Sequence, residues 1–73
     1  MLRVPTLGDS IIIAQQHGDR PAVVTQAGGA QLVEACAFMP LPEHIKVVKI
    51  HANRQEAIGA TLTGTGYHAY WKP

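Results

Sequence analysis

The chain has little of what usually stabilises so small a domain. Cys36 is the single cysteine among 73 residues, so no intrachain disulfide can form. A chain of this length buries only about 60% of its unfolded surface, and small domains commonly compensate with disulfides, a metal or an oligomer. Cys36 lies in the apolar run LVEACAF, with no basic neighbour to activate its thiol. We therefore expect a largely buried cysteine and a reducing compartment.

Long apolar stretches and an excess of one charge are also absent. No apolar run approaches the roughly 20 residues that span a bilayer, and none follows Arg3 as a signal peptide would require. Six Lys and Arg residues against five Asp and Glu give a net charge of +1, without the clustered basic face that binds nucleic acids or anionic membranes. A hydrophobic content of 47% argues against disorder. We expect one soluble, intracellular domain spanning residues 1–73.

The sequence contains no recognisable metal or phosphate motif. Its four histidines are His17, His44, His51 and His68. None forms an HxxxH or HExxH pattern, so a metal would need ligands from separate elements. The Gly64-Thr65-Gly66 segment precedes a predicted strand, whereas phosphate-binding glycine loops open a helix. We expect no metal and no cofactor.

What the sequence does contain is a series of β-branched runs separated by turn signals. Residues 10–15, SIIIAQ, include three consecutive isoleucines, and residues 21–26, PAVVTQ, form a second run of this kind. The polar connection between them contains Gly18-Asp19, which suits a tight turn. Two short runs joined in this way predict an antiparallel hairpin.

Two further strands are predicted in the middle of the chain. Residues 31–38, QLVEACAF, indicate a strand, although the first seven of them also fit a short helix. Residues 44–52, HIKVVKIHA, alternate in polarity. Simple alternation would put Ile45 and Val47 on one face of this strand and Val48 on the other.

The end of the chain predicts a short helical turn and a last strand. Asn53 is a good N-cap for helix formers over residues 53–58, and Gly59 should end the turn. Residues 67–71, YHAYW, form the last predicted strand. About five short strands with frequent turns indicate an all-β fold, most economically a small SH3-like barrel. Closing such a barrel pairs the last strand with the first and hides both edges.

Three short elements together carry a resemblance. They are the segment Arg20-Pro21-Ala22-Val23-Val24, a hydrophobic strand ending in Phe38, and the ending Tyr67-His68-Ala69-Tyr70-Trp71-Lys72-Pro73. With these elements the chain resembles small phage and prophage proteins that have an RPA(I/V)V segment and a GTWHWP-like ending. It departs from their pattern at residues 27–29, where they tend to carry a Trp, and at residues 39–42, where they tend to have an Asp-Gly turn. The resemblance implies a small barrel of phage origin, located in the virion or the host cytoplasm.

The first hairpin carries a second, weaker resemblance. The matching residues are Gly8, Asp9, Ile11, Ile13, Arg20, Pro21, Val23 and Val24. They are similar to the opening of MazF/PemK-type toxin endoribonucleases, in which the Arg before the Pro contributes to RNA cleavage. That role would fall to Arg20, with His68 as a conceivable acid–base partner. Such toxins are longer and use a further Thr or Ser, and Thr61, Thr63 and Thr65 lie in no recognisable motif. We therefore expect no enzymatic activity.

The last strand holds most of the aromatic residues. Three of the four Phe, Tyr and Trp side chains fall within residues 67–71. Tyr67 and Trp71 project to one face, and His68 and Tyr70 to the other. Core packing, base stacking and protein recognition each use such residues, but stacking favours interleaved Lys and Arg, and only Lys72 is adjacent. We expect one face in the core and the other in an interface. The candidate interface residues are Tyr67, His68, Tyr70 and Trp71.

The function expected from these observations is protein binding. The most specific hypothesis is a virion-associated phage accessory protein, a capsid cement or decoration subunit. Its partner would be the major capsid protein or copies of itself, since a marginal core gains stability from a partner that binds only the folded state. The alternatives are an inhibitor of a host protein and an RNA-binding or RNA-cleaving barrel of the toxin type. Membrane and nucleic-acid partners are not favoured.

Overall fold

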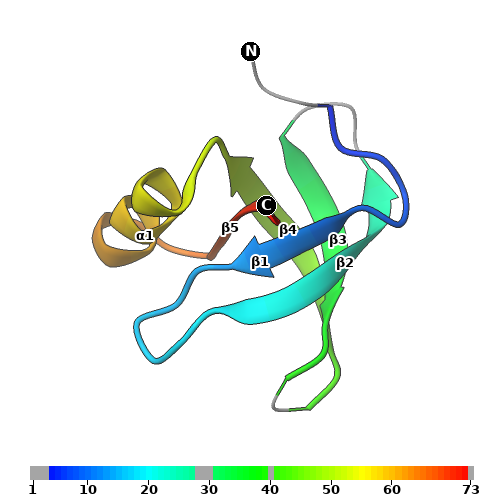
Figure 1. Ribbon diagram of the computed structural model, residues 1–73, viewed down its shortest axis with the longest axis horizontal. Coiled ribbons are helices and arrows are strands. Elements are labelled where there is room, and N and C mark those ends of the chain that lie inside the picture. Colours follow the sequence, from blue (N-terminus) through cyan, green and yellow to red (C-terminus); the bar gives the residue numbers. More distant parts are fainter. Residues whose placement is uncertain (1–3, 28–30, 40, 73) are drawn as a thin grey trace.

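The computed structural model describes residues 4–27, 31–39 and 41–72. Within these ranges five short strands and one helix follow one another along the chain (Figure 1). The strands are β1 (Ser10–Ile13), β2 (Arg20–Ala27), β3 (Leu32–Ala37), β4 (Glu43–His51) and β5 (Tyr67–Trp71). The helix α1 (Arg54–Thr63) connects β4 to β5.

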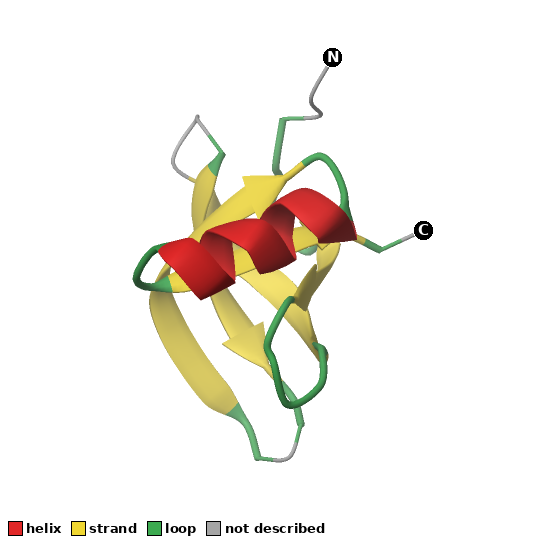
Figure 2. Cartoon of the chain, turned by 90° about the vertical axis from the view of Figure 1, so that its left-hand side faces the viewer, coloured by secondary structure: helices red, strands yellow, loops and turns green. Residues whose placement is uncertain are grey.

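The five strands close into a barrel in which β5 pairs with β1. Four of the strand pairs are antiparallel, whereas β4 and β5 are parallel, because α1 carries the chain back along β4 so that Tyr67 starts β5 opposite Val48. Figure 2 shows α1 lying across the barrel wall, where it packs against β4 and β5. The closed ring leaves the described strands without a free edge.

The pairing confirms two expectations from the sequence. β1 and β2 form an antiparallel hairpin, with Ser10 opposite Val23. The last strand closes on the first, with Ile11 opposite Trp71. The protein is therefore a small, mostly β, five-stranded closed barrel with one short helix.

The barrel interior is filled by aliphatic side chains from all five strands. They are Ile11, Ile13, Ala22, Val24, Val33, Ala35, Ala37, Ile45, Val48, Ile50 and Ala69. Burying one Val or Ile side chain contributes about 1.5–3 kcal/mol, so the seven Val and Ile residues of this set provide much of the hydrophobic stabilisation. Alanines at the remaining positions keep the interior small enough for a barrel of short strands to fill.

β4 does not keep the simple alternation that its sequence suggests. Ile45 and Val48 are both buried, while Val47 is 62% exposed. On β3, the two steps from Val33 to Ala35 lie opposite three steps on β4, which places a bulge at this point of β4. The prediction that Ile45 and Val47 share a face is therefore wrong, because the extra residue reverses the faces that follow it.

The helix begins where the sequence predicts and ends later. Asn53 is the N-cap, and its side chain accepts a hydrogen bond from the Glu56 backbone N–H at 3.0 Å. The predicted turn over residues 53–58 continues through Gly59 to Thr63. The expectation that Gly59 ends the helix is wrong.

Tertiary packing accounts for this extension. Within α1, Ala57 is fully buried. The Thr61 hydroxyl, also on α1, lies 3.1 Å from the Ala14 carbonyl oxygen, to which it donates. A glycine inside a helix costs about 1 kcal/mol relative to alanine. Docking on β4 and β5 offsets that cost at Gly59, since most helical stability in proteins comes from packing.

Candidate protein-binding surface

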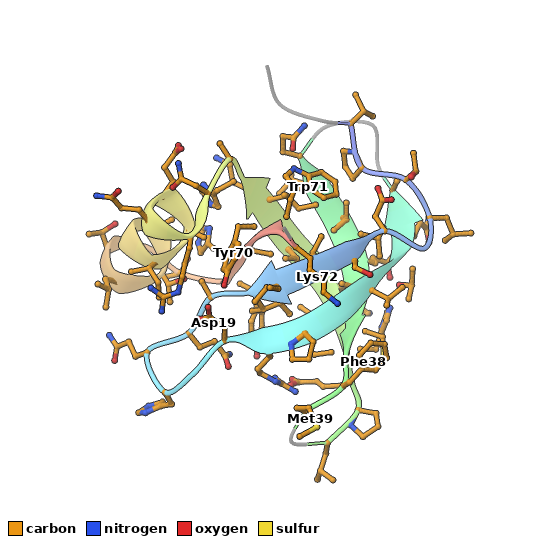
Figure 3. All side chains as sticks on the ribbon, viewed as in Figure 1. Asp19, Phe38, Met39, Tyr70, Trp71 and Lys72 are labelled. Atoms are coloured by element: carbon orange, nitrogen blue, oxygen red, sulfur yellow. The ribbon has the colours of Figure 1, made fainter. Side chains whose placement is uncertain are left out.

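The loop between β3 and β4 projects beyond the end of the barrel (Figure 1) and carries exposed apolar side chains. Phe38 is 46% exposed, Met39 60% and Leu41 73%. In Figure 3, Phe38 and Met39 lie beside the strands that lead into and out of this projection. We call this segment the β3–β4 loop. An apolar cluster at the tip of a hairpin is unusual, because loop tips normally carry polar residues.

Arg20 holds the β3–β4 loop in place. Its Nη1 donates to Glu43 Oε1 at 2.7 Å and its Nη2 to the Leu41 carbonyl at 3.2 Å. Its Nε donates to the Met39 carbonyl. The Arg20 side chain is only 13% exposed, so these charge-assisted bonds are partly shielded from water. Arg20, the first residue of β2, therefore holds both the incoming and the outgoing side of the loop.

A hollow of about 410 Å³ lies next to the loop. Its lining residues are Gln15, Arg20, Leu41, Pro42 and Glu43. The hollow thus combines the apolar edge of the loop with the Arg20–Glu43 ion pair. This mixture of a few polar groups with apolar surface is suited to contact with another protein.

Arg20 and His68, the pair considered for RNA cleavage, make separate contacts. Every nitrogen of the Arg20 guanidinium donates to the β3–β4 loop or to Glu43. His68 contacts His51 and the Thr65 carbonyl instead. Within the described residues, no hydrogen bond joins Arg20 to His68.

Two of the three threonine hydroxyls considered for a toxin-type site, those of Thr61 and Thr63, have structural partners. The single Thr61 hydroxyl proton is shared between the Ala57 carbonyl at 2.9 Å and the Ala14 carbonyl at 3.1 Å, and Thr63 donates to the Gly59 carbonyl at 2.8 Å. The two contacts within α1 run from the hydroxyl to a backbone carbonyl one turn back along the helix. Both hydroxyls are thus engaged by backbone carbonyls, and neither is hydrogen-bonded to Arg20.

The C-terminal strand places its four candidate interface residues on both faces, as the alternation predicts. Tyr67 and Trp71 pack against the core on either side of the fully buried Ala69. His68 and Tyr70 project from the other face, and all four candidates are half-buried. The helix α1 also packs against β5, and the prediction that these side chains contact a partner stays a prediction.

Tyr70 forms part of a small polar cluster with Asp19 and Arg54 (Figure 3). Its hydroxyl donates to Asp19 Oδ2 at 2.5 Å, and Arg54 Nε donates to the same oxygen at 2.8 Å. Burial opposes ionisation of Asp19, but the hydrogen bonds from Arg54 and Tyr70 outweigh it and lower the pKa of the carboxyl. Burial, together with the Asp19 charge, raises the pKa of Tyr70. The cluster joins the β1–β2 loop to α1 and β5.

Cys36 is less buried than its apolar surroundings suggest. Val33, Ala35 and Ala37 fill the barrel interior, so the alternate residues of β3 project outward. Cys36 is one of these and is partly exposed. The expectation of a largely buried thiol is corrected accordingly.

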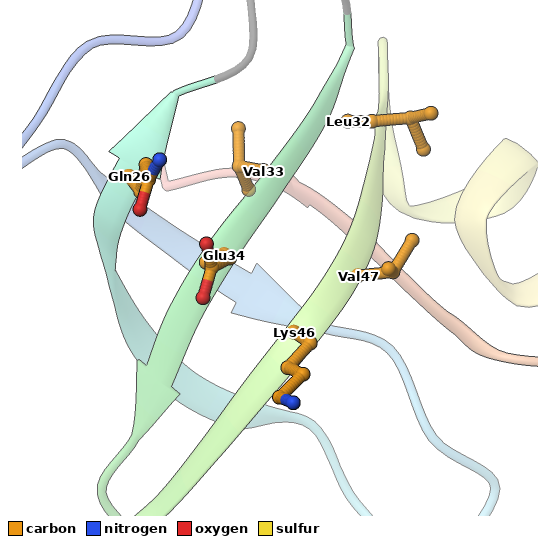
Figure 4. A pocket seen from close by; sticks show the side chains of 6 residues that line it. All are labelled: Gln26, Leu32, Val33, Glu34, Lys46 and Val47. Carbon is orange, nitrogen blue, oxygen red and sulfur yellow. The ribbon is translucent and has the colours of Figure 1, made fainter.

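A second apolar surface lies over β3 and β4 (Figure 4) and was not expected from the sequence. It is a groove of about 220 Å³. The lining residues are Gln26, Leu32, Val33, Glu34, Lys46 and Val47. Val47 reaches it only because of the β4 bulge, and Leu32 is 49% exposed beside it. No local sequence signal indicates a bulge at this point.

The β3–β4 loop was not predicted as a candidate contact segment, although the sequence carried a signal for it. The stretch FMPLP is apolar, yet its two prolines and its position between two strands mark it as a connection. Exposed apolar runs in a connection suggest a function.

The described residues give no metal-binding group of three or more His, Cys, Asp or Glu side chains. In the same part of the chain, no helix is long and apolar enough to cross a bilayer. Comparison with protein-family models, with curated proteins and with solved structures finds no match for this chain.

Proposed function

We propose that this protein works by binding another protein and that the β3–β4 loop supplies the central contact. The observation that carries the proposal is the exposure of Phe38, Met39 and Leu41 on one projecting loop. Apolar side chains held outward on a short loop gain free energy when a partner covers them. Their position at the tip allows them to enter an apolar pocket, the arrangement typical of interface anchors.

The anchoring of the loop supports the same proposal. Arg20 bonds to the backbone of Met39 and Leu41 and to the Glu43 carboxylate. A loop held in this way loses little further conformational entropy on binding, and pre-organisation of this kind increases affinity. The partner is therefore a protein with an apolar hollow and a polar rim that faces the Arg20–Glu43 pair.

The biological setting follows from the resemblance to phage proteins. We propose a virion-associated accessory protein that binds the capsid, with inhibition of a host protein as the alternative in the same class. The partly exposed side chains of His68 and Tyr70 on one face of β5, and of Tyr67 and Trp71 on the other, are further candidate contacts. An RNA-cleaving role receives less support, because Arg20 is already engaged by the β3–β4 loop. Head genes beside the coding gene would favour the capsid role, and an antitoxin gene the nuclease.

The test compares tagged wild-type protein with the variants Leu41→Asp and Leu62→Asp. Both leucines are strongly exposed, at 73% and 57%, but Leu62 lies on α1 and not on the β3–β4 loop. The tagged proteins would be mixed with purified particles or capsid protein of the phage that carries the gene, and the affinity measured. We expect Leu41→Asp to weaken binding at least tenfold and Leu62→Asp to leave it unchanged.

Equal binding by all three proteins would contradict the role of the loop. Binding to lipid vesicles or to single-stranded RNA, but not to protein, would contradict the proposed class of partner. Thermal melts of both variants show whether a loss of binding reflects a loss of folding.

A further inference from the structure

Two imidazole rings meet where β4 ends and β5 begins. His51 Nε2 and His68 Nδ1 are 2.9 Å apart, and the ring centroids are separated by 5.0 Å. Both side chains are half-buried. His51 is the last residue of β4 and His68 the second of β5, so the pair connects the two ends of the α1 crossover.

The surrounding hydrogen bonds determine where the protons lie. His68 Nε2 is 3.0 Å from the Thr65 carbonyl oxygen, which can only accept. His68 Nε2 therefore carries a proton, and in the neutral ring Nδ1 has a free electron pair. That electron pair accepts from His51 Nε2, which must carry a proton of its own. The result is a series of two hydrogen bonds, in which His51 donates to His68 and His68 donates to the Thr65 carbonyl.

This series of hydrogen bonds tolerates one additional proton but not two. The first can bind His51 Nδ1, which is not part of the series, so the bond between the rings stays in place although burial disfavours the added charge. A second proton would have to bind His68 Nδ1. Two N–H groups would then face each other across the 2.9 Å separation, with no acceptor between two positive rings.

The neighbouring charges do not compensate for a doubly protonated pair. Burial lowers the pKa of His51 first, followed by the positive charges of His68 and Lys49, while Glu56 on α1 opposes them. On the other side of the crossover, Asp19 is already paired with Arg54 and Tyr70. Glu56 is therefore the weakest of the influences on His51, and Asp19 is already engaged by Arg54 and Tyr70.

We propose that the His51–His68 pair is an acid-sensitive latch on the β4–α1–β5 crossover. At neutral pH the pair holds the ends of the crossover together. On acidification the second proton breaks the bond between the rings and loosens α1 and the start of β5. The latch is independent of the β3–β4 loop, so it stands whether or not that loop binds a protein.

The direction of the pH effect follows from linkage. A histidine whose folded pKa lies below its ordinary value of 6.5 binds fewer protons in the folded state than in the unfolded state. Its contribution to stability is complete above pH 6.5 and is lost as the pH falls through the folded pKa. The crossover should therefore loosen on the acidic side of neutrality.

The first test is an NMR titration of the imidazole nitrogens in the wild-type protein. At pH 7.5 we expect His68 to be protonated on Nε2, with Nδ1 as an acceptor. His51 and His68 should then titrate as a coupled pair, in two steps separated by more than about one pH unit. Independent titration of the two rings, each in a single step, would overturn the latch.

The second test follows thermal unfolding from pH 7.5 to pH 5 for wild type, His51→Gln, His68→Gln and His17→Gln. His17 lies in the exposed β1–β2 loop and serves as the control. We expect wild type and His17→Gln to lose about 5 °C more than either latch variant over this range, a shift typical for one such interaction in a domain of this size. The same acid-induced loss in all four proteins would overturn the proposal. If a latch variant fails to fold, the NMR titration of the wild-type protein tests the proposal in its place.

Discussion

Two side chains, those of Arg20 and Tyr70, are held by hydrogen bonds to segments far along the chain. Arg20 has the position of a nuclease arginine in the resembling hairpin, yet its guanidinium is taken up by the β3–β4 loop. Tyr70 lies where the sequence predicts an outward-facing interface residue, yet its hydroxyl donates a hydrogen bond to Asp19. In both cases the side chain is held by a hydrogen-bond partner that lies 19 to 51 residues away in the sequence.

Replacing Arg20 should therefore affect stability and the loop, and not catalysis. Arg20→Met removes donors to two backbone carbonyls and to Glu43, which should lower the free energy of unfolding by about 1–2 kcal/mol. Denaturant unfolding measures this loss, and faster proteolysis at the β3–β4 loop would locate it. We expect the wild-type protein not to cleave a mixed single-stranded RNA. Cleavage that disappears in Arg20→Met would contradict this interpretation.

The Asp19–Tyr70 hydrogen bond predicts that the stability of the protein falls at acidic pH, separately from the effect of the histidine pair. The pKa of Asp19 is lowered below 3.8, so its contribution is complete above that pH and is lost as the pH falls through the folded pKa. Tyr70→Phe should reduce stability by about 1 kcal/mol at pH 7. The difference between wild type and Tyr70→Phe should shrink at pH 3. Chemical denaturation at the two pH values measures it, and a constant difference would argue against the bond.

At the scale of elements, the bulge in β4 does most to shape the surface. It turns Val47 outward into the groove of Figure 4 while keeping both Ile45 and Val48 in the core. Bulges commonly re-aim side chains in this way at the rims of barrels. The helix α1 also shapes the surroundings of β5, because it packs against this strand and its Arg54 bonds to the same Asp19 oxygen as Tyr70.

Adjacent valines on β4 should respond very differently to truncation. Val48 is fully buried, so Val48→Ala should destabilise the protein by about 2 kcal/mol through lost burial and a cavity. Val47 is 62% exposed, so Val47→Ala should change stability by less than about 0.5 kcal/mol. Equilibrium denaturation of both variants measures these losses. A larger loss for Val47→Ala than for Val48→Ala would contradict the outward position of Val47.

At the scale of the whole molecule, stability depends on closure. β5 is bonded to β1 on one side and to β4 on the other, so a single strand of five residues holds two others in place. Its Ala69 lies in the core, and Tyr67 and Trp71 cover it. The aromatic residues gather at the end of this chain because the last strand completes the barrel.

A chain truncated after Gly66 should consequently fail to fold. It would lose β5, expose the edges of β1 and β4, and uncover the core around Ala69. Circular dichroism should give no cooperative thermal transition, whereas the full chain should melt in one step. A variant lacking only Lys72 and Pro73 is the matched control and should keep its transition. A cooperative melt of the longer truncation would show that closure is dispensable.

Local patterns identified the strands well and the sites poorly. The isoleucines of β1 and the paired valines of β2 mark buried strands by their type alone. The end of α1 could not be found in this way, because Gly59 signals a stop that burial of Ala57 overrides. The role of Arg20 was equally hidden, since its partners lie in a loop whose position depends on the barrel.

The sequence by itself determined the number of strands, their order along the chain and the pairing of the last strand with the first. These features follow from β-branched runs, turn residues and the need of a short chain to hide its edges, all of which act locally or through length. Only the tertiary structure decided which side chains reach the surface. The β4 bulge, the docking of α1 and the Arg20 anchor depend on register and on contacts between distant segments, and neither is encoded in any single stretch of residues.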